Sequence, residues 1–313
     1  MIIISFYFIR GNMGFSIYDI PYFGEILAFS TAMIWAMAVI LFKKSGESVH
    51  PIGLNIYKGI LSFILIELTM IFLGQELIKD IPLYDYGILL LSGSLGIAIA
   101  DTLFFKTLNL LGAGLTAIVD CLYSPFMITL SMIFLSEQMT FLQIIGVLMI
   151  ISAVVIASKP KDTAHIPKKD LYLGIFMGAM AMLSMAVSIV IAKPLLDQLS
   201  LLWVTNTRMV GALITLGIIL PFFRERKQII GSITNMGNMK YMLPGSFLGA
   251  YLALVLWLGG MKYAQISVAA ALNQTSNVFI FIFAAIFLKE TITTRKTAAI
   301  IMALSGVFLV TFA

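Results

Sequence analysis

The sequence predicts an all-α integral membrane protein with ten transmembrane helices, arranged as two inverted five-helix repeats. Three observations support this fold class. Hydrophobic residues make up 60% of the chain and charged residues only 11%, whereas soluble domains carry about a quarter charged residues. Ten apolar stretches approach the length of a membrane span. The two halves of the chain also align with each other.

The apolar stretches define the expected spans. A helix needs roughly 20 apolar residues to cross a hydrocarbon core of about 30 Å. In chain order the stretches are 24–42, 53–73, 87–108, 113–135, 141–158, 172–192, 201–221, 241–262, 267–288 and 295–313. The polar stretch 159–170 follows the fifth span, and we interpret it as a linker. We therefore expect an N-terminal segment at 1–21, a first repeat at 22–158 and a second repeat at 171–313.

One motif shows the internal repeat most clearly. Residues 134–140 read FLSEQMT, and residues 287–293 read FLKETIT, at an offset of 153 positions. A repeat with an odd number of spans places its second copy upside down in the membrane. Inverted repeats of this kind are typical of secondary transporters, whose sites lie near the midplane between the two copies.

The glutamates of this motif, Glu137 and Glu290, lie where one helix ends and the next begins. Each is either a coupling carboxylate or a structural carboxylate near the positive end of the following helix. Their position at the membrane edge favours the structural interpretation. Thr140 and Gln143 have the spacing of a capping box, which predicts a helix start at this point.

Small residues recur at every fourth position in the third span of each repeat. They are Ser92, Gly96 and Ala100 in the first repeat, and Gly245, Gly249 and Ala253 in the second. Stripes of small residues let transmembrane helices approach closely. We expect helix packing along both stripes, and a surface on which two helix bundles can rock.

Ionisable residues inside the spans are the main candidates for a site, because each costs about 2.5–3.5 kcal/mol on insertion scales. From the helical rise, Lys58 lies roughly 8 Å, and Asp101 and Asp120 about 10 Å, from the same membrane surface. These three charges can therefore neutralise one another. Arg208 and Asn273 occupy the equivalent level from the opposite surface. The alternative for the two basic residues is that they extend to the interface, which the short aspartates cannot do.

Further polar residues lie near the same level. Ser124 and Asn277 follow the polar residues of spans four and nine by one helical turn and share their faces. Pro125 breaks the hydrogen-bond ladder of span four, whereas its equivalent in span nine is Val278. Glu67 has no polar counterpart and stays unassigned. The candidate cavity aromatics are Trp35, Tyr57, Tyr123 and Trp257.

With these motifs the chain resembles a ten-helix member of the drug/metabolite transporter superfamily, with two EamA-type repeats over about 22–313. The resemblance rests on the repeated helix ends, on Lys58 and Arg208 early in the second span of each repeat, and on the Gly-rich third spans SGSLGIAIADTLFF and GSFLGAYLALVLWL. The usual glycine before each glutamate is replaced by Ser136 and Lys289. The resemblance implies export as the commoner direction, but it says little about the substrate.

Membrane orientation has two possible answers. The loops after odd-numbered spans hold fourteen Lys and Arg residues, against four on the side of the termini. The positive-inside rule then places both termini outside the cytoplasm. The resemblance to the superfamily implies the opposite, with both termini in the cytoplasm.

Several classes of function have no support in the sequence. There is no Walker A loop, Rossmann fingerprint or metal-ligand spacing, so we expect no enzyme activity, cofactor or metal. The chain has one cysteine, Cys121, and two histidines. The net charge of +5 suits anionic lipid headgroups and does not indicate nucleic-acid binding.

We therefore expect a multi-pass secondary transporter of the cytoplasmic membrane that moves small polar or amphipathic metabolites. Lys58 and Arg208 are the candidate anion partners, and Asp101 and Asp120 are the candidate counter-charges or proton carriers. The expected partners are a small-molecule substrate, membrane lipid and protons as coupling ion, and a monomer is compatible with the sequence. The alternative is a non-transporting helical scaffold or sensor, whose buried charges only fix the helix register.

Overall fold

The computed structural model describes residues 22–135, 140–159, 166–263 and 272–312. Within these ranges all regular secondary structure is helical. Among the described residues, seven helices are long and apolar enough to cross a membrane, and three shorter apolar helices accompany them. Each of the ten predicted spans coincides with one of these helices, so the predicted fold class is confirmed.

The helices follow the chain in the predicted order. The first repeat contains α2 (Phe23–Ser45), α3 (Pro51–Phe72), α4 (Leu83–Gly93), the π-helix η3 (Ser94–Ile99), α5 (Ala100–Leu111), α6 (Ala113–Asp120), α7 (Tyr123–Leu135) and α8 (Phe141–Ala157). The second contains α9 (Lys168–Gln198), α10 (Leu201–Ile219), α11 (Arg226–Thr234), α12 (Met239–Ser246), the π-helix η6 (Phe247–Leu252), α13 (Ala253–Tyr263), α15 (Ser276–Leu288) and α16 (Thr294–Phe312). The helix α11 was not predicted, because its sequence is polar and too short to span a membrane.

The internal repeat is visible in the helix boundaries. The π-helices η3 and η6 begin and end 153 positions apart, and so do α7 and α15. A π-helix is rare and appears mostly as a single widened turn, frequently at a functional site. Its presence at equivalent positions in both halves shows that the repeat extends to local backbone geometry.

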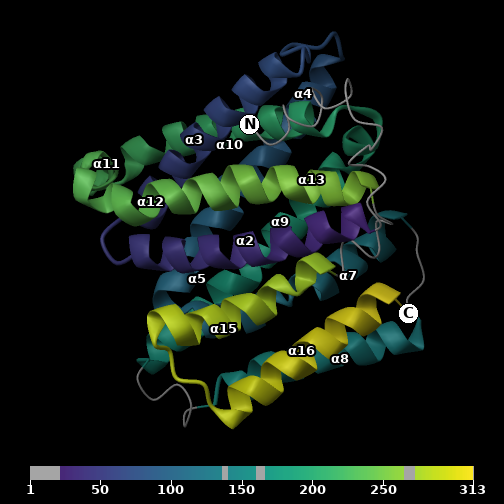
Figure 1. The fold of residues 1–313 in the computed structure, drawn as a ribbon, viewed down its shortest axis with the longest axis vertical. Coiled ribbons are helices and arrows are strands. Elements are labelled where there is room, and N and C mark those ends of the chain that lie inside the picture. The colour runs from purple at the N-terminus through teal and green to yellow at the C-terminus, as the bar shows by residue number, and fades with distance from the viewer. Residues whose placement is uncertain (1–21, 136–139, 160–165, 264–271, 313) are drawn as a thin grey trace, which may run out of the picture.

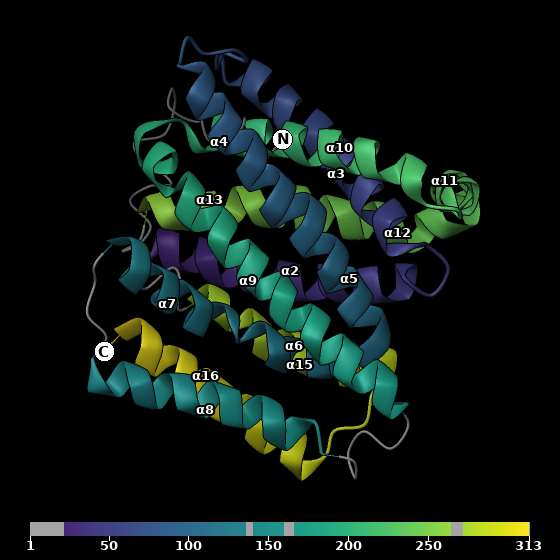
Figure 2. The same ribbon diagram turned by 180° about the vertical axis from the view of Figure 1, so that it is seen from behind.

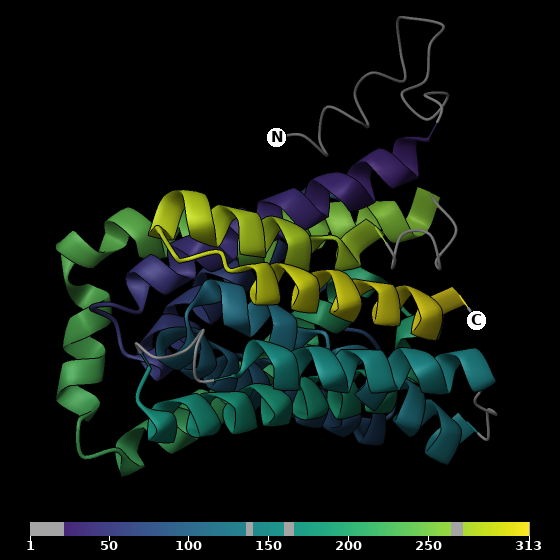
Figure 3. The same ribbon diagram turned by 90° about the horizontal axis from the view of Figure 1, so that it is seen from below.

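The helices lie roughly alongside one another, and helices of different repeats interleave. In Figure 1, α2 of the first repeat lies between α13 and α15 of the second, and it contacts both. Figure 2 shows α9 of the second repeat against α5 of the first. Figure 3 shows α8 and α16 packed together, with α11 running across one end of the bundle.

The helix α3 is amphipathic in the sense expected inside a membrane, with its apolar face outward. Its exposed residues are apolar: Ile60, Ile64, Leu68, Ile71 and Phe72, each 45–70% exposed. Its buried polar residues are Asn55, Lys58, Ser62 and Thr69. A surface of this kind needs a hydrocarbon environment, and the polar face needs partners inside the bundle.

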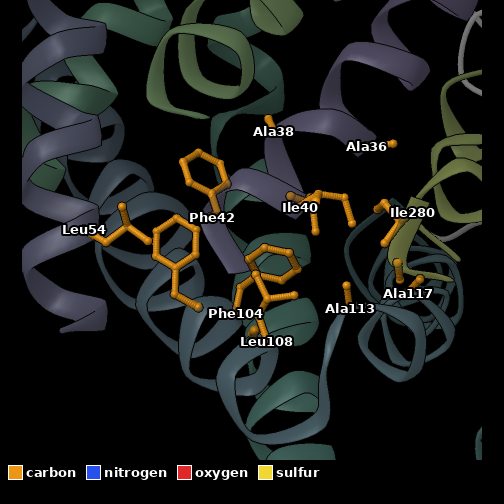
Figure 4. Close-up of a cluster of buried hydrophobic side chains, with 14 of the residues drawn as sticks. Ala36, Ala38, Ile40, Phe42, Leu54, Phe104, Leu108, Ala113, Ala117 and Ile280 are labelled. Atoms are coloured by element: carbon orange, nitrogen blue, oxygen red, sulfur yellow. The ribbon is translucent and has the colours of Figure 1, made fainter. Parts of the chain in front are cut away.

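A cluster of buried apolar side chains fills the space between α2, α5 and α6. Phe42 of α2 packs against Phe105 of α5 with ring centroids 5.0 Å apart and the ring planes tilted by 58°. Figure 4 shows Phe42, Phe104 and Leu108 converging in this cluster. The cluster lies beside Lys58 of α3, whose side-chain nitrogen is 5.4 Å from the centre of the Phe105 ring.

Side-chain caps at the starts of α8 and α3 are local in sequence. At the start of α8 the Thr140 hydroxyl accepts the Gln143 N–H at 3.2 Å, and the Gln143 side chain accepts the Thr140 N–H at 2.9 Å. The predicted capping box is therefore confirmed. At the start of α3 the His50 ring accepts the Ile52 N–H at 3.3 Å.

The contact between α8 and α16 depends on two glycines, Gly146 and Gly306. A Cβ atom at Gly146 would lie 2.7 Å from the Gly306 carbonyl oxygen, and one at Gly306 would lie 2.6 Å from the Gly146 oxygen. Both distances are too short for a real side chain. The two backbones therefore touch only because both positions lack a side chain.

This contact predicts the effect of a single methyl group. Gly306→Ala should destabilise the purified protein by about 1–3 kcal/mol, because the added Cβ forces the helices apart. Thermal unfolding in detergent measures the change. The control is Gly217→Ala in α10, where nothing lies within 4 Å of the added atom. Equal melting temperatures for the two variants would contradict the backbone contact.

Candidate functional site

Lys58 and Asp101 form an ion pair within the membrane-spanning region. The Lys58 ammonium donates to the Asp101 carboxylate, linking α3 to α5. The two side chains are 7% and 14% exposed, and the Lys58 nitrogen also lies 5.4 Å from the centre of the Phe105 ring. Lys58 therefore points into the bundle and does not extend to the membrane surface.

The π-helix η3 sets the position of Asp101, which is the second residue after it. Asn55 of α3 donates its side-chain amide to the Ile97 and Ala98 carbonyl oxygens, at 2.8 and 3.1 Å. A widened turn leaves carbonyl groups displaced from their usual partners, and Asn55 satisfies two of them. Because Asn55 and Lys58 are neighbours on one face of α3, the same helix face holds both the widened turn and the acid.

Arg208 lies deep in α10 and is 8% exposed. Its Nη2 donates to the Ser188 hydroxyl of α9 at 3.0 Å, and its buried Nε has no hydrogen-bond partner. Asp101 and the Tyr123 hydroxyl lie within electrostatic range of the guanidinium. Arg208, Lys58 and Asp101 together form what we call the charged cluster.

A second polar group forms where spans four and nine are interrupted. Helix α6 ends at Asp120 and α7 begins at Tyr123. Between them the Cys121 N–H donates to the Ile118 oxygen, three residues earlier, at 3.3 Å, which makes a tighter turn than an α-helix. Span nine has a matching turn at Thr275, although it has no proline nearby. Sequence reasoning predicted the first interruption from Pro125 and missed the second.

The two interruptions face each other. Asn277 donates to the Cys121 sulfur at 3.5 Å, and Gln274 donates to the Ser124 hydroxyl at 3.3 Å. Asn277 and Ser124 are 4% and 7% exposed. Interrupted helices that meet between inverted repeats are a recurring feature of transporter sites.

Asp120 differs from Asp101 because it has no basic partner. No Lys, Arg or His nitrogen of the described residues lies within 4.0 Å of its carboxylate, and its buried Oδ1 accepts no hydrogen bond. Of the two acids predicted to neutralise Lys58, only Asp101 does so. Asn273, the equivalent of Asp120, is half-buried beside the turn in span nine.

Three of the four predicted aromatics lie near the charged cluster. Trp35, Tyr57 and Tyr123 are half-buried and pack on the apolar cluster shown in Figure 4. The Trp35 ring lies 6.4 Å from that of Phe104. Trp257 is half-buried but does not belong to this cluster.

The two small-residue stripes pack on the first helix of the opposite repeat. Ser92 donates to the Ser188 carbonyl oxygen of α9 at 2.8 Å, and a Cβ atom at Gly96 would overlap the Ser188 side chain. In the other repeat, a Cβ atom at Gly249 would lie 2.9 Å from Ala38 of α2, and Gly245 lies against the same helix. Both stripes therefore lie in contacts between the repeats.

The structure adds polar contacts that sequence reasoning missed. Glu67, left unassigned, accepts the Asn206 side-chain amide at 2.7 Å. Glu290 accepts the Ala113 and Gly114 N–H groups at 2.7 and 2.9 Å. Glu290 thus caps α6 of the first repeat. The sequence had suggested instead that Glu290 lies near the start of the helix that follows it in the chain. Its equivalent, Glu137, lies outside the described residues.

No metal site emerges where the structure describes the chain, since no three His, Cys, Asp or Glu side chains gather there. The arrangement contains two positive charges, one of them paired, and one isolated acid. Chemically it can bind a charged group and hold a proton.

The buried ion pair predicts a non-additive response to mutation. Lys58→Ala alone strands the Asp101 charge and should cost about 3–5 kcal/mol of stability, whereas Lys58→Ala with Asp101→Ala should cost less. Thermal unfolding of the purified variants measures this double-mutant cycle. The matched control combines Lys58→Ala with Asp120→Ala, which should be no better than additive. Additive losses with Asp101 would show that the pair does not form.

Comparison with known proteins agrees with this architecture. The model of the EamA-like transporter family matches residues 22–159 and again residues 172–312. Two proteins of Archaeoglobus fulgidus, each named an uncharacterized transporter, are 24% identical to this chain. One alignment covers 91% of this chain and 96% of the relative, and the other covers 90% and 95%.

A solved crystal structure has the same fold. It matches with a TM-score of 0.64 at 16% identity, over 92% of this chain and 98% of that chain, and at this identity the likeness shows the fold alone. The family match extends over both repeats and confirms the resemblance seen in the motifs. The chain is a multi-pass membrane protein and belongs to the EamA-like transporter family.

Proposed function

We propose that the protein is a secondary active transporter that exports small polar or amphipathic metabolites across the cytoplasmic membrane by alternating access. The observation that supports this most is the charged cluster between the two repeats. Lys58 and Asp101 come from the first repeat and Arg208 from the second. Charges inside a membrane bundle are costly and normally mark a substrate or ion pathway.

The packing between repeats supports a rocking motion. Each small-residue stripe lies against a helix of the opposite repeat, with Gly249 on α2 and Gly96 on α9. Smooth, close contacts of this kind let two bundles slide without unlocking large side chains. Alternating access in inverted-repeat transporters is largely a movement of one bundle against the other around a fixed site.

The rival interpretation is a scaffold or sensor that moves no solute. Purified protein in liposomes loaded with a uniformly ¹³C-labelled metabolite extract separates the two, with mass spectrometry of the released solutes. We expect at least one solute to leave wild-type vesicles faster than protein-free vesicles. The variant Lys58→Met with Asp101→Leu should lose at least about 10-fold in that rate, yet fold normally, because replacing a buried pair by apolar groups is often neutral.

Either of two results would count against this proposal. Wild-type vesicles that release every solute at the protein-free rate would favour the scaffold. A double variant that transports as fast as wild type would separate transport from the charged cluster. The exposed pair Lys193 and Asp197 provides a control, since its removal should leave the rate unchanged.

Asp120 is the proposed proton carrier. An isolated carboxylate with an unsatisfied buried oxygen is costly unless a proton or a cation neutralises it. We expect Asp120→Asn to abolish accumulation of the released solute against its gradient under an imposed pH difference, while thermal-shift binding of that solute survives. Asp197→Asn, an exposed acid on α9, should accumulate normally. Proton-driven accumulation by Asp120→Asn and Asp101→Asn alike would show that neither acid carries the proton.

A further inference from the structure

The two basic residues of the charged cluster differ in how they are neutralised. Lys58 has the Asp101 carboxylate within ion-pair distance. Arg208 has no carboxylate within 4.0 Å among the described residues. Its neighbour Ser188 is neutral and contacts only Nη2. The guanidinium is therefore a buried charge, and its Nε–H has no acceptor.

The repeat explains why Arg208 lacks an acid. Lys58 and Arg208 are equivalent residues, so the equivalent of Asp101 would be the natural partner of Arg208. At the offset of 153 positions that residue is Leu254, which is apolar and packs in an apolar cluster around Trp203. The second repeat has the cation of the pair but not the acid.

Neither Glu67 nor Asp101 serves as a substitute. Glu67 is hydrogen-bonded to Asn206, which precedes Arg208 by two positions. Residues two apart on a helix point to nearly opposite sides, so this contact lies on the other side of α10. Asp101 is engaged by Lys58. The charged cluster of Lys58, Arg208 and Asp101 therefore has one positive charge in excess.

We propose that Arg208 binds the carboxylate of the transported substrate, which makes the substrate class a monocarboxylate metabolite. The inference rests on the proposed transport function and deepens it. A guanidinium presents a planar fork of N–H donors that matches a carboxylate in two-point geometry. One carboxylate balances the single excess charge of the cluster, whereas a doubly charged phosphate would leave it negative. Lys58 is already neutralised by Asp101 and is not the anion site.

Two measurements test this assignment: the change in melting temperature when a ligand binds, and the melting temperature of the ligand-free protein. The full-length protein in detergent is titrated with 2-hydroxy, 2-oxo and 2-amino monocarboxylic acids, each beside its primary amide, and the melting temperature is recorded. A ligand that binds only the folded state raises this temperature. We expect at least one acid to do so while its amide does not. Arg208→Gln should weaken the apparent Kd of that acid by at least about 30-fold.

The matched control is Arg226→Gln, which removes an exposed arginine of α11 and should leave the titration unchanged. Arg208→Gln should also raise the melting temperature of ligand-free protein, because it removes an uncompensated buried charge. This readout does not depend on having chosen the right acid, and it distinguishes a ligand-binding arginine from a structural one.

Five results would overturn the assignment. Acids and amides could shift the melting temperature equally, or no acid could shift it. The shift could survive in Arg208→Gln, or that variant could be less stable than wild type without ligand. Lipid nanodiscs with phosphatidylglycerol in place of phosphatidylcholine could reproduce an Arg208-dependent shift that no soluble acid gives, which would assign the arginine to a lipid headgroup. In each case solute release from proteoliposomes would still stand as a separate test of transport.

Discussion

Inside a bilayer every backbone polar group needs a partner within the protein, and this constraint governs where helices of the bundle can deviate. At three such places a side chain from another helix supplies the partner. Ser184 of α9 donates to the Leu95 oxygen of η3 at 2.8 Å, and Ser62 of α3 donates to the Ala250 oxygen of η6 at 2.8 Å. Glu290 does the same for the free N–H groups of α6. All three contacts join the first repeat to the second, so the distorted turns also hold the repeats together.

The same turns place the charges. Asp101 follows η3, and Asp120 ends α6 where the helix is interrupted. In a regular helix the backbone N–H and C=O groups bond to each other along the helix axis. Such a helix contributes only side chains to a site. A widened or interrupted turn adds backbone groups and changes the direction of the side chains that follow. The polar face of α3 contacts both kinds of group, since Asn55 donates to a backbone carbonyl oxygen and Lys58 donates to the Asp101 carboxylate.

The sequence predicts those features that depend only on position along the chain. Hydrophobic length gives the spans, and the helical rise gives the depth of Lys58 and Asp101, which is why their pairing was among the predicted combinations. Rotation about the helix axis depends on packing, so depth alone could not choose between Asp101 and Asp120. The partner of Glu290 lies 177 positions away at Ala113, and no local pattern indicates it. The turn at Thr275 was missed for a related reason, because tertiary packing imposes it where no proline does.

The two repeats match in backbone but not in charge. The π-helices occur at equivalent positions, and a serine of the opposite repeat donates to a carbonyl oxygen of each. The acids have no such symmetry, since Leu254 replaces Asp101 and Asn273 replaces Asp120. In the proposed alternating-access mechanism, a symmetric backbone lets either side of the bundle open at similar cost, because each bundle then presents the same contacts to the other. A small substrate has no such symmetry, and its charged end must find one partner only. The proposed mechanism meets both requirements, since the helices exchange roles while Arg208 remains the residue of the charged cluster that needs a negative charge.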